Sequence, residues 1–514
     1  MSPLPLIDRL PLACGPTARA LLDGTLPATW HAPRPATAAA WRERALAGRG
    51  APLGRDWGWT LREAFASSGA AAARLARVSE GQGVVVTTGQ QPGLFGGPLY
   101  TLAKALSALA LADAIERATG VPAAPVFWAA TDDTDFAEGA SIALPTADGT
   151  RAATLAHAPA EGTMLAHAPV GDARAALAAL REACGGGAWA EPARVAHEAY
   201  GAPGATVGGA YVTLLRHLLQ PLGIAVLDAA HPDVRRAARP WLRRALVDAA
   251  PLDAAVRART EALRARGLAP QVEPVGDRAL VFSVQDGTRT RASVQGARAL
   301  LHDLPDDGLS PNVLLRPVIE RALMPTVAYV AGPGELAYFA QVGAVADVLD
   351  LPQPLAVPRA SVRVVTEATQ ATLRRLALDA DALRAPHAAE ATLARAATPD
   401  AAFDALASLR AAVRAATGSL GAAGTALPAP VIDGAAAQLA HRIDRLERRL
   451  VAAAKRERGA DLARLAAARA QLWPDGVPQE RKLGAMPWIV RHGPPFVQAL
   501  REACDAAMHP LVHG

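Results

Sequence analysis

Three short segments of the chain carry the side chains most able to do chemistry. The first is the glycine-rich stretch 88–97, which contains Gln90 and Gln91 and is followed by Lys104. Backbone amides of such a loop, with a helix N-terminus behind them, can hold a phosphate or a carboxylate. The spacing fits neither a P-loop nor a dinucleotide fingerprint, so a plain tight turn is the alternative. Lys104 either reaches a phosphate or lies on a solvated helix face.

The second segment is acidic and follows an apolar run. It contains Asp132, Asp133, Asp135 and Glu138. Carboxylates in this arrangement can bind Mg²⁺, an amine or sugar hydroxyls, or one of them can act as a general base. The alternative is an acidic loop in which an aspartate caps the next helix.

The third segment is discontinuous and pairs the stretch 310–317, which contains Asn312 and Arg316, with the stretch 332–341. The planar guanidinium of Arg316 matches a carboxylate or a phosphate. Glu335 is expected in the first turn of a helix, and Tyr338 and Gln341 follow three and six residues later, near the same face. A buried structural arginine and an ordinary capped helix are the alternative interpretation.

Strand and helix patterns predict how these segments are positioned. Runs of β-branched and apolar residues at 84–88, 125–129 and 326–330 predict buried strands, and helices are expected at 98–118 and 335–348. The strand–helix–strand order predicts an α/β fold with a parallel sheet, which binds ligands at the carboxyl ends of its strands. We therefore expect the three segments to meet in one crevice.

The rest of the chain predicts insertions and a helical arm. A 4-3-4 spacing of apolar residues from Leu439 to Leu450, with an earlier pattern at 403–413, predicts two long antiparallel helices. Coiled-coil packing and plain helical packing are both open. The predicted division is a core at 1–140, 206–250 and 306–361, an insertion at 141–205, a small β-containing insertion at 251–305, an arm at 362–472 and a C-terminal return to the core at 473–514.

Composition excludes several classes of protein. The 514 residues are 51% hydrophobic and 20% charged, which favours packed domains over disorder. A net charge of +5 and 4% aromatic residues do not indicate a nucleic-acid binder. Three widely spaced cysteines indicate no disulfide framework and a reducing cytoplasm. We expect no signal peptide or membrane span, and the sequence contains no metal-ligand or covalent-nucleophile motif.

The same segments resemble one known family. The stretch TGQQPGLFGGPLYT at 88–101, with Lys104, resembles the TGQQxGLFxGPLYTxxK signature of the bacillithiol-biosynthesis cysteine-adding enzymes (BshC). Residues 310–317 and 332–341 resemble the second and third blocks of that family. The stretches 357–361 and 479–481 are weaker matches. Element order and length are similar from end to end.

This resemblance implies a Rossmann-like core related to class I synthetases and nucleotidyltransferases, an inserted connecting domain, and a coiled-coil arm used for homodimerisation. The implied activity is addition of cysteine to glucosaminyl-malate, the last step of bacillithiol synthesis. One departure stands out, because the family commonly reads EDHDF after its second strand. Here Asp132 replaces the glutamate and Thr134 replaces the histidine. A mechanism that needs an imidazole at that position would fail in this chain.

Our hypothesis is a cytoplasmic amide-forming ligase that activates the cysteine carboxyl with ATP or another nucleotide, as an acyl-adenylate, with Mg²⁺ optional and no redox cofactor. The alternatives are a non-catalytic, nucleotide-responsive dimeric scaffold, a diverged paralogue with another amine or acid, and a nucleotidyltransferase that releases an adenylated small molecule. The predicted catalytic residues are Asp133, Asp135 and Lys104. The predicted substrate- or nucleotide-binding residues are Thr88, Gly89, Gln90, Gln91, Gly97, Tyr100, Trp128, Asp132, Asn312, Arg316, Gly332, Gly334, Glu335, Tyr338 and Gln341.

Overall fold

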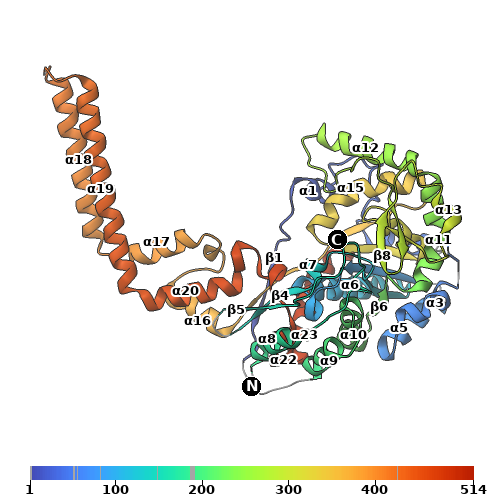
Figure 1. The fold of residues 1–514 in the computed structure, drawn as a ribbon. Coiled ribbons are helices and arrows are strands. Elements are labelled where there is room, and N and C mark those ends of the chain that lie inside the picture. The colour runs from blue at the N-terminus through green and yellow to red at the C-terminus, as the bar shows by residue number, and fades with distance from the viewer. Residues whose placement is uncertain are drawn as a thin grey trace. The chain divides into compact units, whose positions relative to one another are not determined.

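The structure is a computed structural model that describes residues 3–49, 53–54, 56–80, 83–146, 149–185, 191–396, 398–424 and 426–513. The chain divides into two compact units, Met1–Val364 with Gln479–Gly514 and Val365–Pro478. The first unit contains a five-stranded sheet covered by helices, and the second is largely helical (Figure 1). The predicted α/β fold with a helical arm is therefore confirmed.

The central sheet is parallel throughout, with the strand order β11-β10-β2-β3-β6. From β2 the chain moves outward on one side to β3 and β6, and it then returns to the other side of β2 as β10 and β11. This reversal creates a switch point beside β2, where open sheets of this kind bind their ligands. The strands are β2 Val84–Gln90, β3 Ala123–Ala129, β6 Ala225–Asp228, β10 Thr326–Ala331 and β11 Ala356–Pro358.

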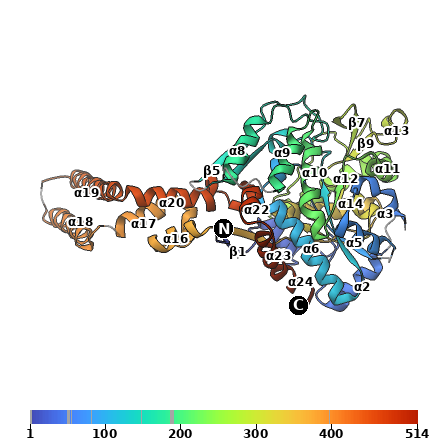
Figure 2. The same cartoon turned by 90° about the horizontal axis from the view of Figure 1, so that it is seen from below.

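Helices cover both faces of this sheet, because its strands are apolar on both sides (Figures 1 and 2). Val84 and Val86 of β2 belong to the core that contains α6 (Leu99–Thr119) and α23 (Pro494–Met508). Val85 points to the opposite face and belongs to the core that contains α15 (Pro333–Val348). The alternation follows the two-residue period of a strand.

Helix α6 connects β2 to β3 and carries Lys104. It begins after Pro98 and ends at Gly120, whose φ of +69° lies in the left-handed region that glycine adopts without steric cost. Most of its side chains are buried, since β2 and β3 lie against one side and α23 against another. Lys104, which lies within the buried part of this helix, therefore has little access to bulk water.

Two insertions interrupt the order of the core strands. The first lies between β3 and β6 and contains α7 Phe136–Gly139, β4 Ser141–Pro145, β5 Thr150–Thr154, α8 Arg174–Cys184, α9 Glu191–Gly201 and α10 Val207–Leu219. The second lies between β6 and β10 and includes an antiparallel sheet of order β8-β7-β9. Its elements are α11 Pro232–Val247, α12 Ala249–Arg264, β7 Val281–Gln285, β8 Thr288–Arg291, α13 Leu300–Asp303, β9 Leu309–Pro311 and α14 Arg316–Leu323.

The N- and C-terminal parts of the first unit complete its core. They contain β1 Leu6–Leu10, α1 Pro16–Leu22, α2 Ala38–Gly48, α3 Trp57–Thr60, α4 Arg62–Phe65, α5 Gly69–Glu80, α21 Gln479–Lys482, α22 Met486–His492 and α24 Pro510–His513. The three cysteines, Cys14, Cys184 and Cys504, are all unpaired, as the sequence predicts. Within the described ranges, no helix has the length and apolar character needed to cross a membrane.

The second unit contains the predicted pair of long helices. Helices α18 (Asp400–Ala422) and α19 (Ala429–Glu457) run side by side (Figure 1), and Arg410 joins them through Asp444 at 2.6 Å and Glu447 at 2.5 Å. Gly459, where the sequence predicts an interruption, is the first residue of a separate helix, α20 (Gly459–Leu472). The remaining helices are α16 Glu367–Leu376 and α17 Pro386–Ala396.

Candidate functional site

A cleft of about 290 Å³ opens at the carboxyl edge of the sheet. All three segments singled out in the sequence contribute to its wall. The first contributes Gly89, Gln90, Gln91, Tyr100 and Lys104. The end of β3 and the acidic segment contribute Trp128, Asp132 and Asp133. The third contributes Asn312, Arg316, Gly332, Gly334, Glu335 and Tyr338.

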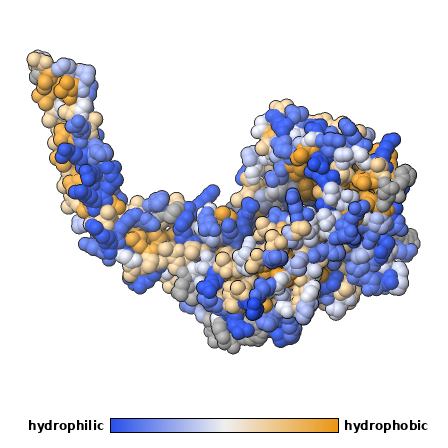
Figure 3. Space-filling model, viewed as in Figure 1, coloured by the Kyte–Doolittle hydropathy of each residue, from blue (hydrophilic) through white to orange (hydrophobic). Residues whose placement is uncertain are grey.

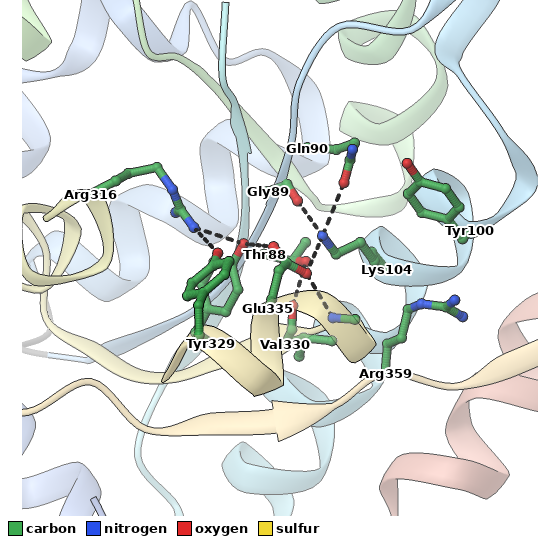
Figure 4. Close-up of polar contacts among 12 residues, drawn as sticks. Thr88, Gly89, Gln90, Tyr100, Lys104, Arg316, Tyr329, Val330, Glu335 and Arg359 are labelled. Carbon is green, nitrogen blue, oxygen red and sulfur yellow. Dashed lines mark hydrogen bonds and ion pairs between the residues drawn. The ribbon is translucent and has the colours of Figure 1, made fainter. Parts of the chain in front are cut away.

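Lys104 is buried, with 1% of its surface exposed, so it does not lie on a solvated helix face. Its ammonium donates to the Gly89 carbonyl at 2.5 Å and to Gln90 Oε1 at 3.2 Å, and it lies 2.5 Å from Glu335 Oε2 (Figure 4). Burial lowers the pKa of Lys104, and the neighbouring carboxylate of Glu335 opposes that effect. Lys104 thus joins the end of β2 to the start of α15.

Glu335 links Lys104 to a second group of polar side chains. Its Oε2 accepts a hydrogen bond from the Gly332 amide at 2.7 Å, and its Oε1 accepts one from the Tyr329 hydroxyl at 2.5 Å. Burial raises the pKa of Glu335, but Lys104 and these hydrogen bonds outweigh burial and hold it below its ordinary value. Arg316 Nη2 completes the chain, donating to Tyr329 at 3.2 Å and to Tyr338 at 3.1 Å.

Arg316 is also anchored from behind by Glu320. Its Nη1 lies 3.0 Å from Glu320 Oε2, and the Thr87 hydroxyl donates to the other oxygen of that carboxylate. Burial raises the pKa of Glu320 to about 7, although Arg316 and Thr87 both favour the ionised form. Arg316 is therefore largely occupied by protein partners while it lines the cleft.

The acidic segment forms the side of the cleft next to β3. The Ser310 hydroxyl donates to Asp132 Oδ2 at 2.6 Å, and Arg289 Nη1 donates to the Asp132 carbonyl at 3.0 Å. Asp133 Oδ1 accepts hydrogen bonds from the amides of Thr134 at 2.6 Å and Asp135 at 3.0 Å. Burial raises the pKa of Asp133. Asp133 is thus a carboxylate at the cleft wall that holds a proton more tightly than an exposed aspartate does.

The glycine loop itself is a turn and not an open anion cradle. Its Gly96 amide donates to the Gly93 carbonyl at 3.1 Å, and the Gly97 amide donates to the Leu94 carbonyl at 3.1 Å. At the start of α6 the Leu99 amide donates to the Leu483 carbonyl at 2.8 Å. These amides are already used, so the tight-turn alternative describes this part of the loop.

Four predicted site residues do not line the cleft. Thr88 is buried and donates to the Val330 carbonyl at 2.8 Å, and Gly97 closes the turn before α6. Asp135 caps α7 by accepting from the Glu138 amide at 3.1 Å, as the capping alternative predicts. Gln341 is fully buried and binds Thr260 and Val272, so it packs the back of α15 against the second insertion.

Sequence reasoning did not select four polar residues of the cleft: Arg289, Tyr329, Arg359 and Arg481. Arg289 comes from β8 in the second insertion, where no motif marked it. Tyr329 lies inside a strand that its pattern identified only as core. Arg359 and Arg481 belong to the two weaker family matches, which was the one available signal.

The donor set of the cleft fits an oxyanion better than a protein-held metal. Within the described ranges, no three His, Cys, Asp or Glu side chains gather in a way that could hold a metal ion. Asp132 and Asp133 alone supply two carboxylates, and Mg²⁺ bound by so few carboxylates also needs substrate phosphates. The cleft is lined by five cationic side chains and three carboxylates, and Glu320 and Glu480 hold Arg316 and Arg359 from behind. The N–H donors that line the wall, rather than a net positive charge, suit a phosphate or a carboxylate.

The fold and the cleft define a Rossmann-like α/β protein with a polar cleft at the switch point of its sheet. A family model described as "Bacillithiol biosynthesis BshC, N-terminal Rossmann-like domain" matches residues 60–360. A second, described as "Bacillithiol biosynthesis BshC, C-terminal coiled-coil domain", matches residues 425–511. The chain therefore belongs to the BshC family.

Curated relatives support this assignment along most of the chain. Three of them bear the printed name "Putative cysteine ligase BshC". The relative from Solibacter usitatus is 32% identical over 438 residues, which cover 82% of this chain and 82% of the relative. The relative from Koribacter versatilis is 31% identical and covers 86% of each chain. The relative from Salinibacter ruber is 31% identical over 84% of this chain and 82% of its own.

Proposed function

We propose that the protein is a ligase that joins the carboxyl group of cysteine to the amine of glucosaminyl-malate, in bacillithiol biosynthesis. The names of the relatives support a cysteine ligase. The observation that carries the proposal is the convergence of Gln90, Asp133 and Arg316 on one cleft, because amide formation needs both an anion site and an acceptor for the proton of the amine.

The residues of the cleft divide between these two tasks. The cationic side chains and Gln90 would hold the carboxylate and phosphate oxygens of the substrates. Asp133 would orient the amine and accept its proton as the carbon–nitrogen bond forms, and the raised pKa of Asp133 suits a general base. The buried pairs of Lys104 with Glu335 and Arg316 with Glu320 would keep the site rigid before the substrates bind.

ATP is proposed as the source of the driving force, since a carboxylate at neutral pH is a poor acyl donor. The guanidinium groups that line the cleft support a phosphate-bearing substrate, because they match phosphate oxygens. Mg²⁺ would enter with the phosphates, because the described carboxylates form no metal cluster of their own. The unpaired state of the three cysteines supports a reducing compartment such as the cytoplasm.

We further propose that the helical unit joins two copies of the chain. Leu409 on α18 and Leu439 and Leu446 on α19 are 46%, 44% and 52% exposed. Figure 3 shows apolar surface along this pair of helices. Large apolar side chains on long helices favour burial against a partner helix, and the implied coiled-coil role makes a second copy the expected partner.

Mass spectrometry tests the proposed activity. The full chain is incubated with cysteine, glucosaminyl-malate, ATP and Mg²⁺, and each component is omitted in turn. The expected result is a thiol-bearing amide whose mass is the sum of the two substrates less water, formed only in the complete mixture. Nucleotide binding in calorimetry without binding of cysteine or the amino sugar, and without product, would favour the scaffold alternative.

A further inference from the structure

The ammonium group of Lys104 has no hydrogen left for a ligand. A lysine ammonium has three donors and no acceptor. In this structure the three face the Gly89 carbonyl, Gln90 Oε1 and Glu335 Oε2, at 2.5, 3.2 and 2.5 Å. The group is also almost completely buried. Lys104 therefore acts on the cleft through the groups that it holds.

The contact with Lys104 fixes which end of the Gln90 amide faces the cleft. Because an ammonium cannot accept a hydrogen bond, the amide oxygen of Gln90 must be the atom that faces it. The amide nitrogen then points away from Lys104, as Figure 4 shows. Gln90 is partly exposed and lines the cleft, and its nitrogen has no hydrogen-bond partner in the described parts of the chain.

The neighbouring glutamine shows the contrast. Gln91 also lines the cleft, but its amide nitrogen donates to Glu138 Oε2. One of its two N–H donors is thus engaged with a carboxylate of the protein, whereas the structure shows no such bond for the Gln90 nitrogen within the described residues. Two adjacent residues of the same type therefore differ in what they can offer a ligand.

We propose that Gln90 is a specificity-determining residue whose amide N–H groups bind an oxyanion of the substrate, and that Lys104 is the positioning residue that fixes this amide. The inference rests on the proposed function, because it assumes that substrates carrying carboxylate or phosphate oxygens enter the cleft. The guanidinium groups that line the cleft beside Gln90 support such a ligand.

In this arrangement Gln90 and Asp133 bind different groups of the substrates. A protonated amine donates hydrogen bonds and cannot accept one, so the Gln90 N–H groups offer it no partner, whereas the carboxylate of Asp133 in the same cleft does. The ligand group expected at the Gln90 nitrogen is an oxygen that only accepts hydrogen bonds. A substrate carboxylate and a phosphoryl group both have such oxygens, and the experiment distinguishes them.

The first test replaces Gln90 by a residue of the same shape without the donors. Gln90→Glu still accepts from Lys104, so the fold and the melting temperature should be kept, but it presents a carboxylate to the ligand. Inorganic phosphate and L-malate are titrated separately into the full chain by calorimetry. Binding should weaken by about tenfold or more, the scale of a lost hydrogen bond to a charged group. Gln295→Glu, an exposed position outside the cleft, is the charge-matched control and should bind as the wild type does.

The second test asks whether Lys104 acts through Gln90. Lys104→Met is combined with Glu335→Gln, so that no buried carboxylate is left unpaired. The two substitutions together should weaken the binding of phosphate or malate when Gln90 is present. It should cause no further loss when Gln90→Leu is already present, because the oriented amide is then absent. Equal losses in both backgrounds would mean that Lys104 does not position Gln90.

The separate titrations with malate and with phosphate show which oxyanion Gln90 binds. A loss confined to malate assigns the carboxylate, a loss confined to phosphate assigns the phosphoryl group, and a loss of both assigns a common oxyanion site. Wild-type binding by Gln90→Glu, or a wild-type chain that binds neither probe, would overturn the inference. Because these are binding measurements, they stand apart from product formation. If the wild-type chain makes the product and Gln90→Glu binds both probes normally, the proposed function stands and this role of Gln90 is rejected.

Discussion

Arg359 and Glu480 form a buried two-point ion pair across 121 positions of sequence. Arg359 Nη1 lies 2.8 Å from Glu480 Oε2, and its Nη2 lies 2.7 Å from Oε1. Glu480 also accepts hydrogen bonds from the Ser361 hydroxyl at 2.9 Å and the Val362 amide at 3.0 Å. The pair attaches α21 to the chain after β11, and it thereby positions Arg359 and Arg481 at the cleft.

Removal of Glu480 should destabilise the first unit strongly. Glu480→Ala leaves the Arg359 guanidinium buried without its partner, a loss of about 3–5 kcal/mol in the free energy of unfolding. Denaturant unfolding of the full chain measures this change. Glu502→Ala, an exposed glutamate on α23, is the control and should cost less than about 0.5 kcal/mol. Similar values for the two variants would show that the buried pair contributes no special stability.

Glu320 should make stability depend on pH near neutrality. Its pKa is raised from 4.5 to about 7 by burial, so the folded state favours the protonated acid relative to the unfolded chain. For an acid with a raised pKa, this stabilising contribution is present below the unfolded value and is lost as pH rises through the folded value. The free energy of unfolding of the wild type, minus that of Glu320→Gln, should therefore fall by about 2–3 kcal/mol between pH 5 and 8.

Unfolding curves of both proteins at these two pH values test the effect of Glu320. The comparison removes contributions from other titrating groups, because they are common to both chains. A difference that stays constant, or that grows with pH, would contradict the assignment of the raised pKa to this carboxyl group.

Asp133 and Thr134 should differ sharply in their effect on product formation. Asp133→Asn removes the proposed base and should lower the rate by about hundredfold or more. Thr134 does not line the cleft, so Thr134→Ala should stay within about threefold of wild type. Mass spectrometry of the complete reaction gives both rates. If Thr134→Ala were the inactive variant, the residue at the family's histidine position would be the one that matters.

The pH dependence of the reaction should report the same group. Burial raises the pKa of Asp133, and a base works only when deprotonated, so the wild-type rate should increase with pH through that raised pKa. The residual rate of Asp133→Asn should lack this step. A step of equal size in both proteins would assign the titration to another group.

The exposed leucines of α19 should control the oligomeric state. Leu439→Glu with Leu446→Glu places two charges on the apolar surface and should convert a dimer into a monomer in sedimentation experiments. Arg414→Glu on α18 is the control for charge on the same unit. A monomeric wild-type chain would contradict dimerisation through this arm.

Periodicity and turn residues carried most of the information about the fold. The strand at 84–88 and the helix after Pro98 follow directly from a β-branched run and from a glycine stop, and the structure has them within two residues of the expected bounds. The burial of Lys104 could not be read in the same way. Helix α6 is apolar almost all round, so its sequence shows no polar face from which a solvated or buried lysine could be told apart.

The cleft was harder to predict where residues come from the insertions. Arg289 reaches the site only because β8 pairs with β7 next to the third segment, a contact that no local pattern encodes. Gln341 was expected near the face of Glu335 from helical spacing. It points instead toward Thr260 and Val272, because six residues rotate a helix well away from its starting direction.

A crystal structure with cysteine and glucosaminyl-malate bound tests the central claim most directly. The account predicts both ligands in the cleft between Gln90, Asp133 and Arg316, with the amine facing Asp133 and an oxyanion facing the Gln90 amide nitrogen. Substrates bound at another surface of the chain, with this cleft empty, would contradict it.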